Sequence, residues 1–279
     1  MFEKIKCPIC HLKKNSIYSE DDDYTSLICK NCKHIHVITH NQVDYTNLYN
    51  SNFYETYGVG GYKQDFNKYI DENLHKIEVI KKLIPKGGKV LEVGCGPGLF
   101  LDLLQKNDIE CLGVELNFEA IDYGKSIGCN AEIITADISK HPNPITNKKY
   151  DIAIMFATIE HVEEPADFIN LVTKYLKSGG YLIIDTGIRG ALGEIMEDGR
   201  SEWLTPPYHL HVFSKSSMRI LIERANLDII YSNTKFNYNF KTEKNVTLFV
   251  KSLLKKLLYK LRLSTKNKNT FKGFYICQK

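Results

Sequence analysis

The fold is decided by the stretch Val90-Leu91-Glu92-Val93-Gly94-Cys95-Gly96-Pro97-Gly98, in which an apolar strand runs directly into a glycine-rich turn. Residues 99–104 are mostly apolar and predict a helix after the turn. Glycines at a strand-to-helix turn let a ligand approach the backbone at the carboxyl edge of a parallel sheet. A dinucleotide fingerprint would have a glycine where this chain has Leu99, so the spacing predicts a different ligand.

Strand candidates alternate with helical stretches along most of the chain. A helix is expected over residues 62–84, and strands over 89–93, 111–115, 132–135, 150–156, 180–186 and 227–232. Because this alternation is typical of parallel sheets, we expect an α/β fold with helices on both faces. The 279 residues, 43% hydrophobic and 25% charged, suit a globular protein of one large domain with a small appendage and exclude a disordered or fibrous chain.

Four of the eight cysteines form two Cys-x-x-Cys pairs near the N-terminus, Cys7/Cys10 and Cys29/Cys32. Four thiolates at this spacing can converge tetrahedrally on Zn²⁺ and leave no open position, so we expect a structural zinc site. The acidic run at 20–23 and the alternating segment that follows predict a hairpin between the pairs.

The remaining four cysteines are expected to be small core residues; they are Cys95, Cys111, Cys129 and Cys277. We recognise no signal peptide and no apolar stretch of the length that crosses a bilayer. We therefore expect a cytoplasmic protein, in which spaced cysteines more often bind metal than form disulfides.

The string 91–98 resembles the first motif of class I S-adenosylmethionine (SAM)-dependent methyltransferases. Glu115, Asp137, the segment 150–162 and the strand 181–184 match later family segments in order. The resemblance covers roughly residues 62–279 and implies a Rossmann-like seven-stranded sheet. It also implies that Glu115 accepts both ribose hydroxyls and that Asp137 accepts the adenine amino group. The cofactor-binding residues expected from it are Glu92, Gly94, Cys95, Gly96, Gly98, Glu115, Leu116, Asp137, Ile138 and Phe156.

Three histidines are candidates for removing a proton from the methyl acceptor, because they follow the fourth and fifth strands. His161 follows the fourth strand, whereas His209 and His211 lie in the segment 206–214, at the end of an insertion expected over 188–213. This segment resembles one in bacterial small-molecule methyltransferases that modify sugars of antibiotics and surface glycans.

In the sugar C-methyltransferases of that group a histidine at this place is the general base, and His209 takes its position. Tyr208 stands where that group has an acid, so we prefer oxygen to carbon as the methylated atom. His211 and His161 are the alternative catalytic residues. His211 is otherwise expected to pack near Ser214, a good N-cap for the next helix, and His161 to hydrogen-bond within its loop.

The formal net charge of +4 divides into −6 for residues 1–243 and +10 for residues 244–279. Within the basic part, residues 245–263 place apolar residues on one helical face and Lys and Arg largely opposite, which predicts a basic amphipathic helix. It precedes the segment 274–277, the expected antiparallel last strand, so we expect it to pack on the sheet or over the acceptor cleft. Contact with an anionic membrane surface, a partner or nucleic acid is the alternative.

The predicted organisation is a zinc-binding module over 1–43, an ordered connector over 44–61 and a methyltransferase domain over 62–279. A similar zinc module precedes the sugar C-methyltransferases, where it helps to close the acceptor site. Some ribosomal-RNA guanine methyltransferases also begin with one, but they would need a basic surface, which the acidic run at 20–23 does not favour.

The resulting hypothesis is SAM-dependent methyl transfer to a small polar acceptor. A hydroxyl of a sugar or nucleotide-linked precursor in surface-glycan or secondary metabolism is preferred. SAM is the expected co-substrate and Zn²⁺ the expected structural metal. The alternatives are a sugar C-methyltransferase, an rRNA or tRNA methyltransferase, and a non-catalytic SAM-binding scaffold. The expected partner is the small-molecule acceptor, and nucleic acid is not expected. Peripheral membrane contact through 245–263 stays open. The sequence does not predict an oligomeric state.

Overall fold

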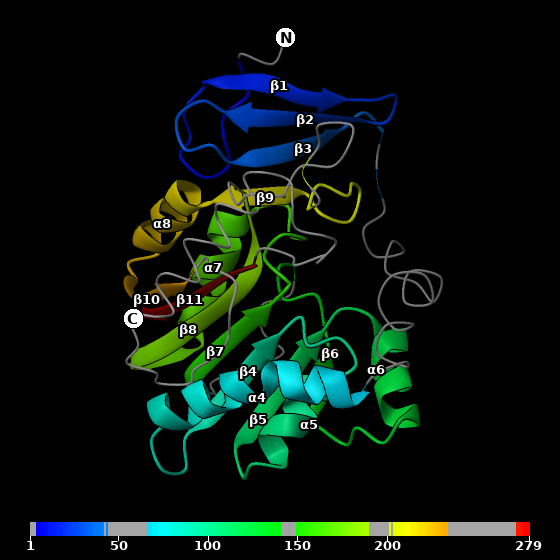
Figure 1. Ribbon diagram of the computed structural model, residues 1–279, viewed down its shortest axis with the longest axis vertical. Helices are drawn as coiled ribbons and strands as arrows, with labels where there is room; N and C mark the ends of the chain where they lie inside the picture. The colour runs from blue at the N-terminus through cyan, green and yellow to red at the C-terminus, as the bar shows by residue number, and fades with distance from the viewer. Residues whose placement is uncertain are drawn as a thin grey trace, which may run out of the picture.

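A computed structural model describes residues 4–41, 43, 66–140, 145, 149–189, 201, 203–233 and 272–279. Figure 1 shows a small antiparallel sheet at the N-terminal end of the molecule and, below it, a larger sheet flanked by helices. The predicted connector 44–61, the predicted basic helix 245–263, and residues 190–200 and 202 of the predicted insertion lie outside the described residues. Within the described residues, no helix is long and apolar enough to cross a membrane.

The larger sheet is formed by β4 (Lys89–Val93), β5 (Glu110–Glu115), β6 (Ile133–Thr135), β7 (Tyr150–Phe156), β8 (Leu176–Arg189), β10 (Asp228–Asn233) and β11 (Lys272–Gln278). These strands lie in the order β6-β5-β4-β7-β8-β11-β10. The first five are mutually parallel, whereas β11 is antiparallel to both β8 and β10. The strand order reverses between β4 and β7, which is where open parallel sheets bind their ligands.

The helices are α4 (Phe66–Leu83), α5 (Leu99–Gln105), α6 (Phe118–Ser126), α7 (Pro165–Lys174) and α8 (Lys215–Arg224). Alternate side chains of the central strands contact different helices, because successive strand residues point to opposite faces. Leu91 and Val93 pack in one core cluster with residues of α7 and α8. Val90 packs in a second cluster with residues of α4 and α5. The sheet is thus covered on both faces, as the alternating sequence pattern predicts.

The N-terminal sheet is formed by β1 (Asn15–Glu20), β2 (Tyr24–Cys29) and β3 (Ile35–Thr39), all antiparallel. The pairing of β1 with β2 confirms the predicted hairpin between the cysteine pairs. The short strand β9 (His211–Ser214) pairs with β3 on one side and with the end of β8 on the other. Figure 1 shows β9 between the two sheets, so that they form one continuous hydrogen-bonded layer.

Ser214 caps α8 as the sequence predicts. Its side chain accepts a hydrogen bond from Ser217 N, and the Ser217 hydroxyl accepts one from the backbone N–H of Ser214. The Ser214 hydroxyl also donates to the carbonyl of Cys32 at 2.5 Å, and the Ser216 hydroxyl donates to the same carbonyl at 2.7 Å. The start of α8 therefore holds the second cysteine pair against the body of the fold.

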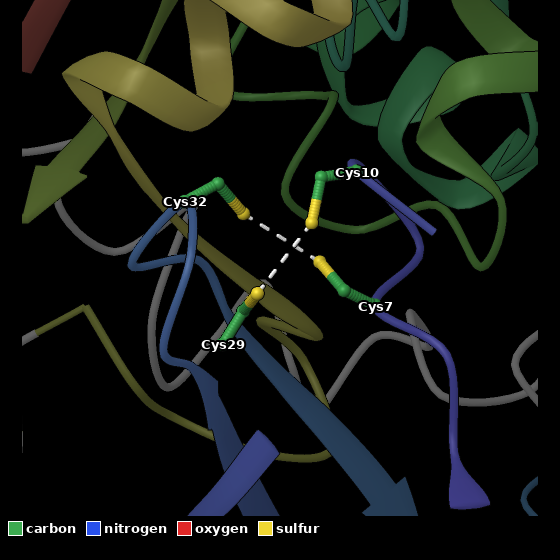
Figure 2. A group of neighbouring side chains, drawn as sticks. All are labelled: Cys7, Cys10, Cys29 and Cys32. Atoms are coloured by element: carbon green, nitrogen blue, oxygen red, sulfur yellow. Dashed lines mark hydrogen bonds between the residues drawn. The ribbon is translucent and has the colours of Figure 1, made fainter. Parts of the chain in front are cut away.

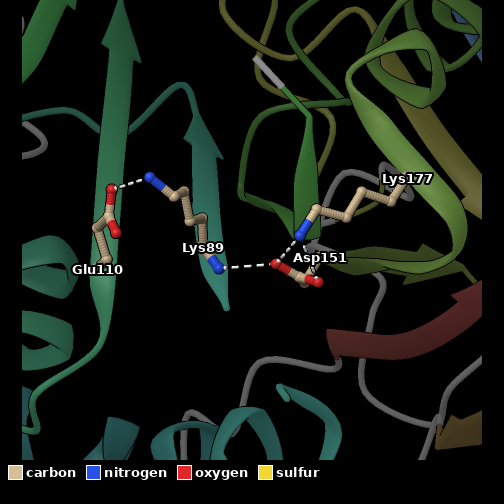
Figure 3. Close-up of polar contacts among 4 residues, drawn as sticks. All are labelled: Lys89, Glu110, Asp151 and Lys177. Atoms are coloured by element: carbon tan, nitrogen blue, oxygen red, sulfur yellow. Dashed lines mark hydrogen bonds and ion pairs between the residues drawn. The ribbon is translucent and has the colours of Figure 1, made fainter. Parts of the chain in front are cut away.

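The amino ends of the parallel strands are joined by charged groups (Figure 3). Asp151 accepts from Lys177 Nζ with both carboxylate oxygens at 2.9 Å and from the backbone N–H of Lys89 at 2.8 Å. Lys89 Nζ in turn lies 2.5 Å from Glu110 Oε1. This network lies at the sheet edge opposite the glycine turn, so it serves strand register rather than ligand binding.

Candidate functional site

The glycine turn joins β4 to α5, and its three glycines have left-handed backbone angles: φ is +70° at Gly94, +53° at Gly96 and +80° at Gly98. A Cβ on Gly94 would lie 2.5 Å from Thr158 Cγ2, and one on Gly98 would lie 2.8 Å from Ile133 Cδ1. A Cβ on Gly96 would meet no heavy atom within 4 Å. Gly94 and Gly98 are therefore needed for close packing, whereas an added Cβ at Gly96 would point into open space.

Glu115 ends β5 beside the turn and is 9% exposed. Its Oε2 accepts from the backbone N–H of Gly96 at 2.7 Å, and its Oε1 accepts from that of Asn117 at 2.9 Å. Burial raises the pKa of this carboxyl, while those N–H groups and the nearby His161 act in the opposite direction. Each oxygen has a further lone pair, so the carboxylate can still accept ligand hydroxyls.

Asp137 lies beyond β6 and is partly exposed. Its Oδ1 accepts from the backbone N–H groups of Ser139 and Lys140 and from the Ser139 hydroxyl, and Oδ2 lies 3.3 Å from Lys140 Nζ. Desolvation works to raise the pKa of Asp137, but the Ser139 hydroxyl and Lys140 outweigh it and lower the pKa. Asp137 is thus an ionised acceptor held rigidly at the carboxyl edge, which the predicted adenine contact needs.

The remaining predicted cofactor residues surround the same edge. Ile138 is buried in the core, Leu116 is partly exposed after β5, and the Cys95 side chain packs into the core on the α4/α5 side. Phe156 ends β7, with its ring centroid 4.9 Å from that of Phe100. The structure therefore gathers the residues that the sequence predicted, and their roles toward a ligand stay predictions.

A buried charged pair that the sequence analysis missed lies beneath the turn. Lys76 of α4 places Nζ 2.6 Å from Asp185 Oδ2 of β8 and 4.0 Å from the centroid of the Phe156 ring. Glu92 of β4 is 3% exposed, and its Oε2 has no hydrogen-bond partner among the described residues. Desolvation raises the pKa of Glu92 to about 8, against the opposing charge of Lys76. Two features of the sequence could have revealed this pair. One is a charged lysine on an apolar helix face, and the other is an aspartate ending an apolar strand.

His161 and His209, two of the predicted catalytic residues, lie together, with ring centroids 4.8 Å apart. Burial lowers the pKa of His209, which keeps its ring neutral at pH 7. The loop that holds His161 contacts the end of β4 at the turn, because Thr158 donates to the Val93 carbonyl at 3.0 Å. Glu160, which the sequence analysis did not single out, lies beside them.

His211, the third predicted catalytic residue, lies apart from that pair in a buried stack of histidines. Its Nε2 is 2.8 Å from the carbonyl of Val162, and its Nδ1 is 3.0 Å from His34 Nε2. Because a carbonyl only accepts, Nε2 of His211 carries the proton and Nδ1 accepts from His34. Burial lowers the pKa of His211 to about 3. This arrangement ties β3 to β9, which is the packing alternative expected for His211.

The four N-terminal cysteines converge on one point (Figure 2). Cys7 Sγ lies 3.6 Å from Cys32 Sγ, and Cys10 Sγ lies 3.5 Å from Cys29 Sγ. Four thiolates around a tetrahedral zinc ion at about 2.3 Å would be about 3.8 Å apart, so the spacing fits with little movement.

The two Cys-x-x-Cys turns have the same backbone geometry. His11 and Lys33, which follow the second cysteine of each pair, have φ of +57° and +60°. Their N–H groups donate to the carbonyls of Cys7 and Cys29, each at 2.9 Å. The two pairs therefore present their sulfurs in equivalent ways, as a four-thiolate metal site requires.

A family model described as a methyltransferase domain matches residues 62–232. The ubiquinone biosynthesis O-methyltransferase of Pectobacterium carotovorum subsp. carotovorum is 26% identical over 118 residues, which are 39% of this chain and 47% of that protein. The chain thus matches about half the length of the curated relatives.

Solved structures show the same fold. A SAM-dependent methyltransferase from Archaeoglobus fulgidus has a TM-score of 0.54 at 17% identity, covering 82% of this chain and 98% of that one. The plantazolicin methyltransferase, crystallised with a triazolic analogue and S-adenosylhomocysteine, has a TM-score of 0.55 at 17% identity, covering 82% of this chain and 93% of that one. These likenesses confirm the predicted fold class.

Proposed function

The chain belongs to the class I SAM-dependent methyltransferases, and from this premise we propose that it transfers a methyl group from SAM to a hydroxyl of a small polar acceptor. The observation that carries the proposal is the open space at Gly96, bordered by the Glu115 carboxylate. SAM would supply a methyl group already activated on its sulfonium. The task left to the protein is to hold both reactants in line and to deal with one proton.

In this proposal Glu115 holds the ribose and Asp137 the adenine of the cofactor. The buried pair of Lys76 and Asp185 fixes α4 against β8 below the turn. One buried oxygen of the nearby Glu92 has no hydrogen-bond partner among the described residues and can accept from the ammonium of an amino acid group. These side chains come from four different elements and the loop after β6, so the site exists only when the sheet is formed.

The acceptor side of the proposal rests on an open hollow of about 400 Å³, lined by Asp21, Asp22, Asp23, Tyr24, Leu204, Thr205 and Pro206. The hollow adjoins His209, whose N–H donates to the Thr205 carbonyl at 3.2 Å. Three carboxylates can accept hydroxyls of a sugar and repel a phosphate-rich polymer. This favours a sugar over RNA, and the relatives named as O-methyltransferases favour oxygen as the methylated atom.

We further propose that Cys7, Cys10, Cys29 and Cys32 bind a structural Zn²⁺. With four protein ligands the ion has no open coordination position, so it takes no part in chemistry. Its place next to α8 and β9 suggests that it holds the acidic hairpin turn over the acceptor hollow.

The test is to incubate the purified chain with SAM and a panel of sugars and nucleotide sugars, and to measure S-adenosylhomocysteine and methylated product by mass spectrometry. Formation of both with a sugar supports the proposal, and NMR of the product separates an O-methyl from a C-methyl group. Transfer to RNA alone, or tight SAM binding without turnover on any acceptor class, would contradict it in favour of an RNA methyltransferase or a scaffold.

A further inference from the structure

Glu160, His161 and His209 form a second group of potential metal ligands, separate from the cysteines. Glu160 and His161 lie in the loop after β7, and His209 lies just before β9. One ligand atom from each lies within 4.8 Å of the others. The two segments are held together by their backbones, because Leu210 N and His211 N donate to the Glu160 carbonyl at 2.9 and 3.2 Å.

The hydrogen bonds of the two imidazoles decide which nitrogen each presents to the cluster. His161 Nδ1 lies 2.9 Å from the Tyr208 carbonyl, and His209 Nδ1 lies 2.8 Å from the Trp203 carbonyl. A carbonyl oxygen only accepts, so each Nδ1 carries a proton, and Nε2 is the nitrogen that can ligate a metal ion. Backbone carbonyls commonly orient metal-binding histidines in this way.

Glu160 brings a third potential ligand group, a carboxyl oxygen. It is 1% exposed, its Oε2 accepts from the Thr186 hydroxyl at 2.8 Å, and its Oε1 has no hydrogen-bond partner among the described residues. A buried carboxylate oxygen without a donor costs stability unless a cation or a donor satisfies it. The three side chains therefore bring one carboxyl oxygen and two imidazole nitrogens close together, and a cation bound there would satisfy the buried Glu160 oxygen.

We propose that Glu160, His161 and His209 hold a divalent transition-metal ion such as Mn²⁺ or Zn²⁺. Two imidazoles and a carboxylate are a donor set that such ions take, and three protein ligands leave at least one coordination position open. Ligand atoms at about 2.1 Å from an ion lie roughly 3–3.5 Å apart, so small side-chain rotations close the site. The four-cysteine site has no open coordination position, so its ion is structural. Because the ion at Glu160, His161 and His209 has one, we expect it to have a different role.

The role of the ion rests on the proposed function. An acceptor hydroxyl bound at the open position would lose its proton more easily, as metal-bound water does. The O–H bond breaks and its proton passes to solvent, the oxygen forms a bond to the methyl carbon, and the electrons of the C–S bond go to sulfur. His209 then acts as a ligand instead of the general base that the sequence analysis predicted. The loop that holds Glu160 and His161 adjoins the glycine turn, because Thr158 donates to the Val93 carbonyl at 3.0 Å and its side chain packs against Gly94.

The experiment is a Mn²⁺ titration of the full chain loaded with a single equivalent of zinc for the four cysteines, followed by electron paramagnetic resonance, with neither SAM nor acceptor present. Mn²⁺ prefers nitrogen and oxygen donors, so it does not compete for the four cysteines. We expect one Mn²⁺ per chain, and in Glu160→Gln and His209→Gln an affinity lowered by at least ~10-fold, the lower end of the loss seen for outer-shell partners. Glu163→Gln is the matched control, because Glu163 is exposed in the same loop.

Absence of Mn²⁺ binding to the wild-type chain, or equal binding by Glu160→Gln and Glu163→Gln, would overturn the proposal. His209→Gln decides the question if Glu160→Gln does not fold, as thermal unfolding would show. The result is independent of the proposed function, because the titration contains no methyl donor. If the chain binds Mn²⁺ but transfers no methyl group, the metal-site proposal stands and the proposed function is wrong.

Discussion

Two glycines allow ligand binding to be separated from folding. Gly96, in the turn between β4 and α5, and Gly128, just after α6, have φ of +53° and +91°. An added Cβ at either position meets no heavy atom within 4 Å. Alanine at either position therefore introduces backbone strain without a clash, and only the alanine at position 96 enters the space expected to hold SAM.

The expected loss of stability is the sum of two opposing effects on the backbone, strain in the folded state and reduced freedom in the unfolded state. Alanine in the left-handed region costs about 1–2 kcal/mol, and the reduced freedom of the unfolded chain offsets about 0.4–1 kcal/mol of this. Gly96→Ala and Gly128→Ala should each lower the free energy of unfolding by about 1 kcal/mol and the Tm by about 2–4 °C. Gly94→Ala should cost about 1–3 kcal/mol more, because its Cβ would overlap Thr158.

The assay is SAM binding by isothermal titration calorimetry on folded protein, beside thermal unfolding of each variant. We expect Gly96→Ala to bind SAM at least ~10-fold more weakly than wild type, a loss of about 1.4 kcal/mol. Gly128→Ala should bind SAM as the wild type does. Equal SAM affinity of the two variants would refute the reasoning, because the open space at Gly96 would then not be where the cofactor lies.

Three further substitutions test the buried pair, the cysteine site and the sheet edge. Lys76→Met removes the ammonium beside the buried Asp185 carboxylate and should lower the free energy of unfolding by about 3–5 kcal/mol. Urea denaturation measures it, and a loss under about 1 kcal/mol would contradict the importance of the pair. Cys29→Ser should reduce the zinc content of the chain, measured by elemental analysis, and lower the Tm; an unchanged zinc content would argue against a four-cysteine site. Asp151→Asn should lower the free energy of unfolding by about 1 kcal/mol at neutral pH. Burial works to raise the pKa of Asp151, but Lys177 outweighs it and the pKa is lowered. Its contribution is present above the unfolded pKa of about 3.9 and is lost as the pH falls through the folded one. Urea midpoints of wild type and variant should therefore converge in acid, and a constant difference at low pH would show that the charge is not involved.

Local sequence patterns predicted most of the elements of the larger sheet. The run from Val90 to Gly98 places a strand, a turn and a helix in order, and the structure has β4, the turn and α5 there. Ser214 was recognised as a helix cap because capping depends on neighbours in the chain. The strands β3 and β9 were missed. β9 has four residues and pairs with β3 and β8, and β3 pairs with β2 and β9, so both depend on partners distant in the chain.

The sequence by itself determined the class of the fold, the glycine turn and the four-cysteine cluster, because each depends on residues at fixed short spacings. The tertiary structure alone decided how distant segments meet. It joined the N-terminal sheet to the larger one through the contact of His34 with His211, and it placed Lys76 against Asp185, 109 positions apart. It also brought Glu160 and His161 next to His209, with a potential ligand atom of each within 4.8 Å of the others. No local sequence pattern encodes these long-range contacts, because they arise from the order of strands in the sheet.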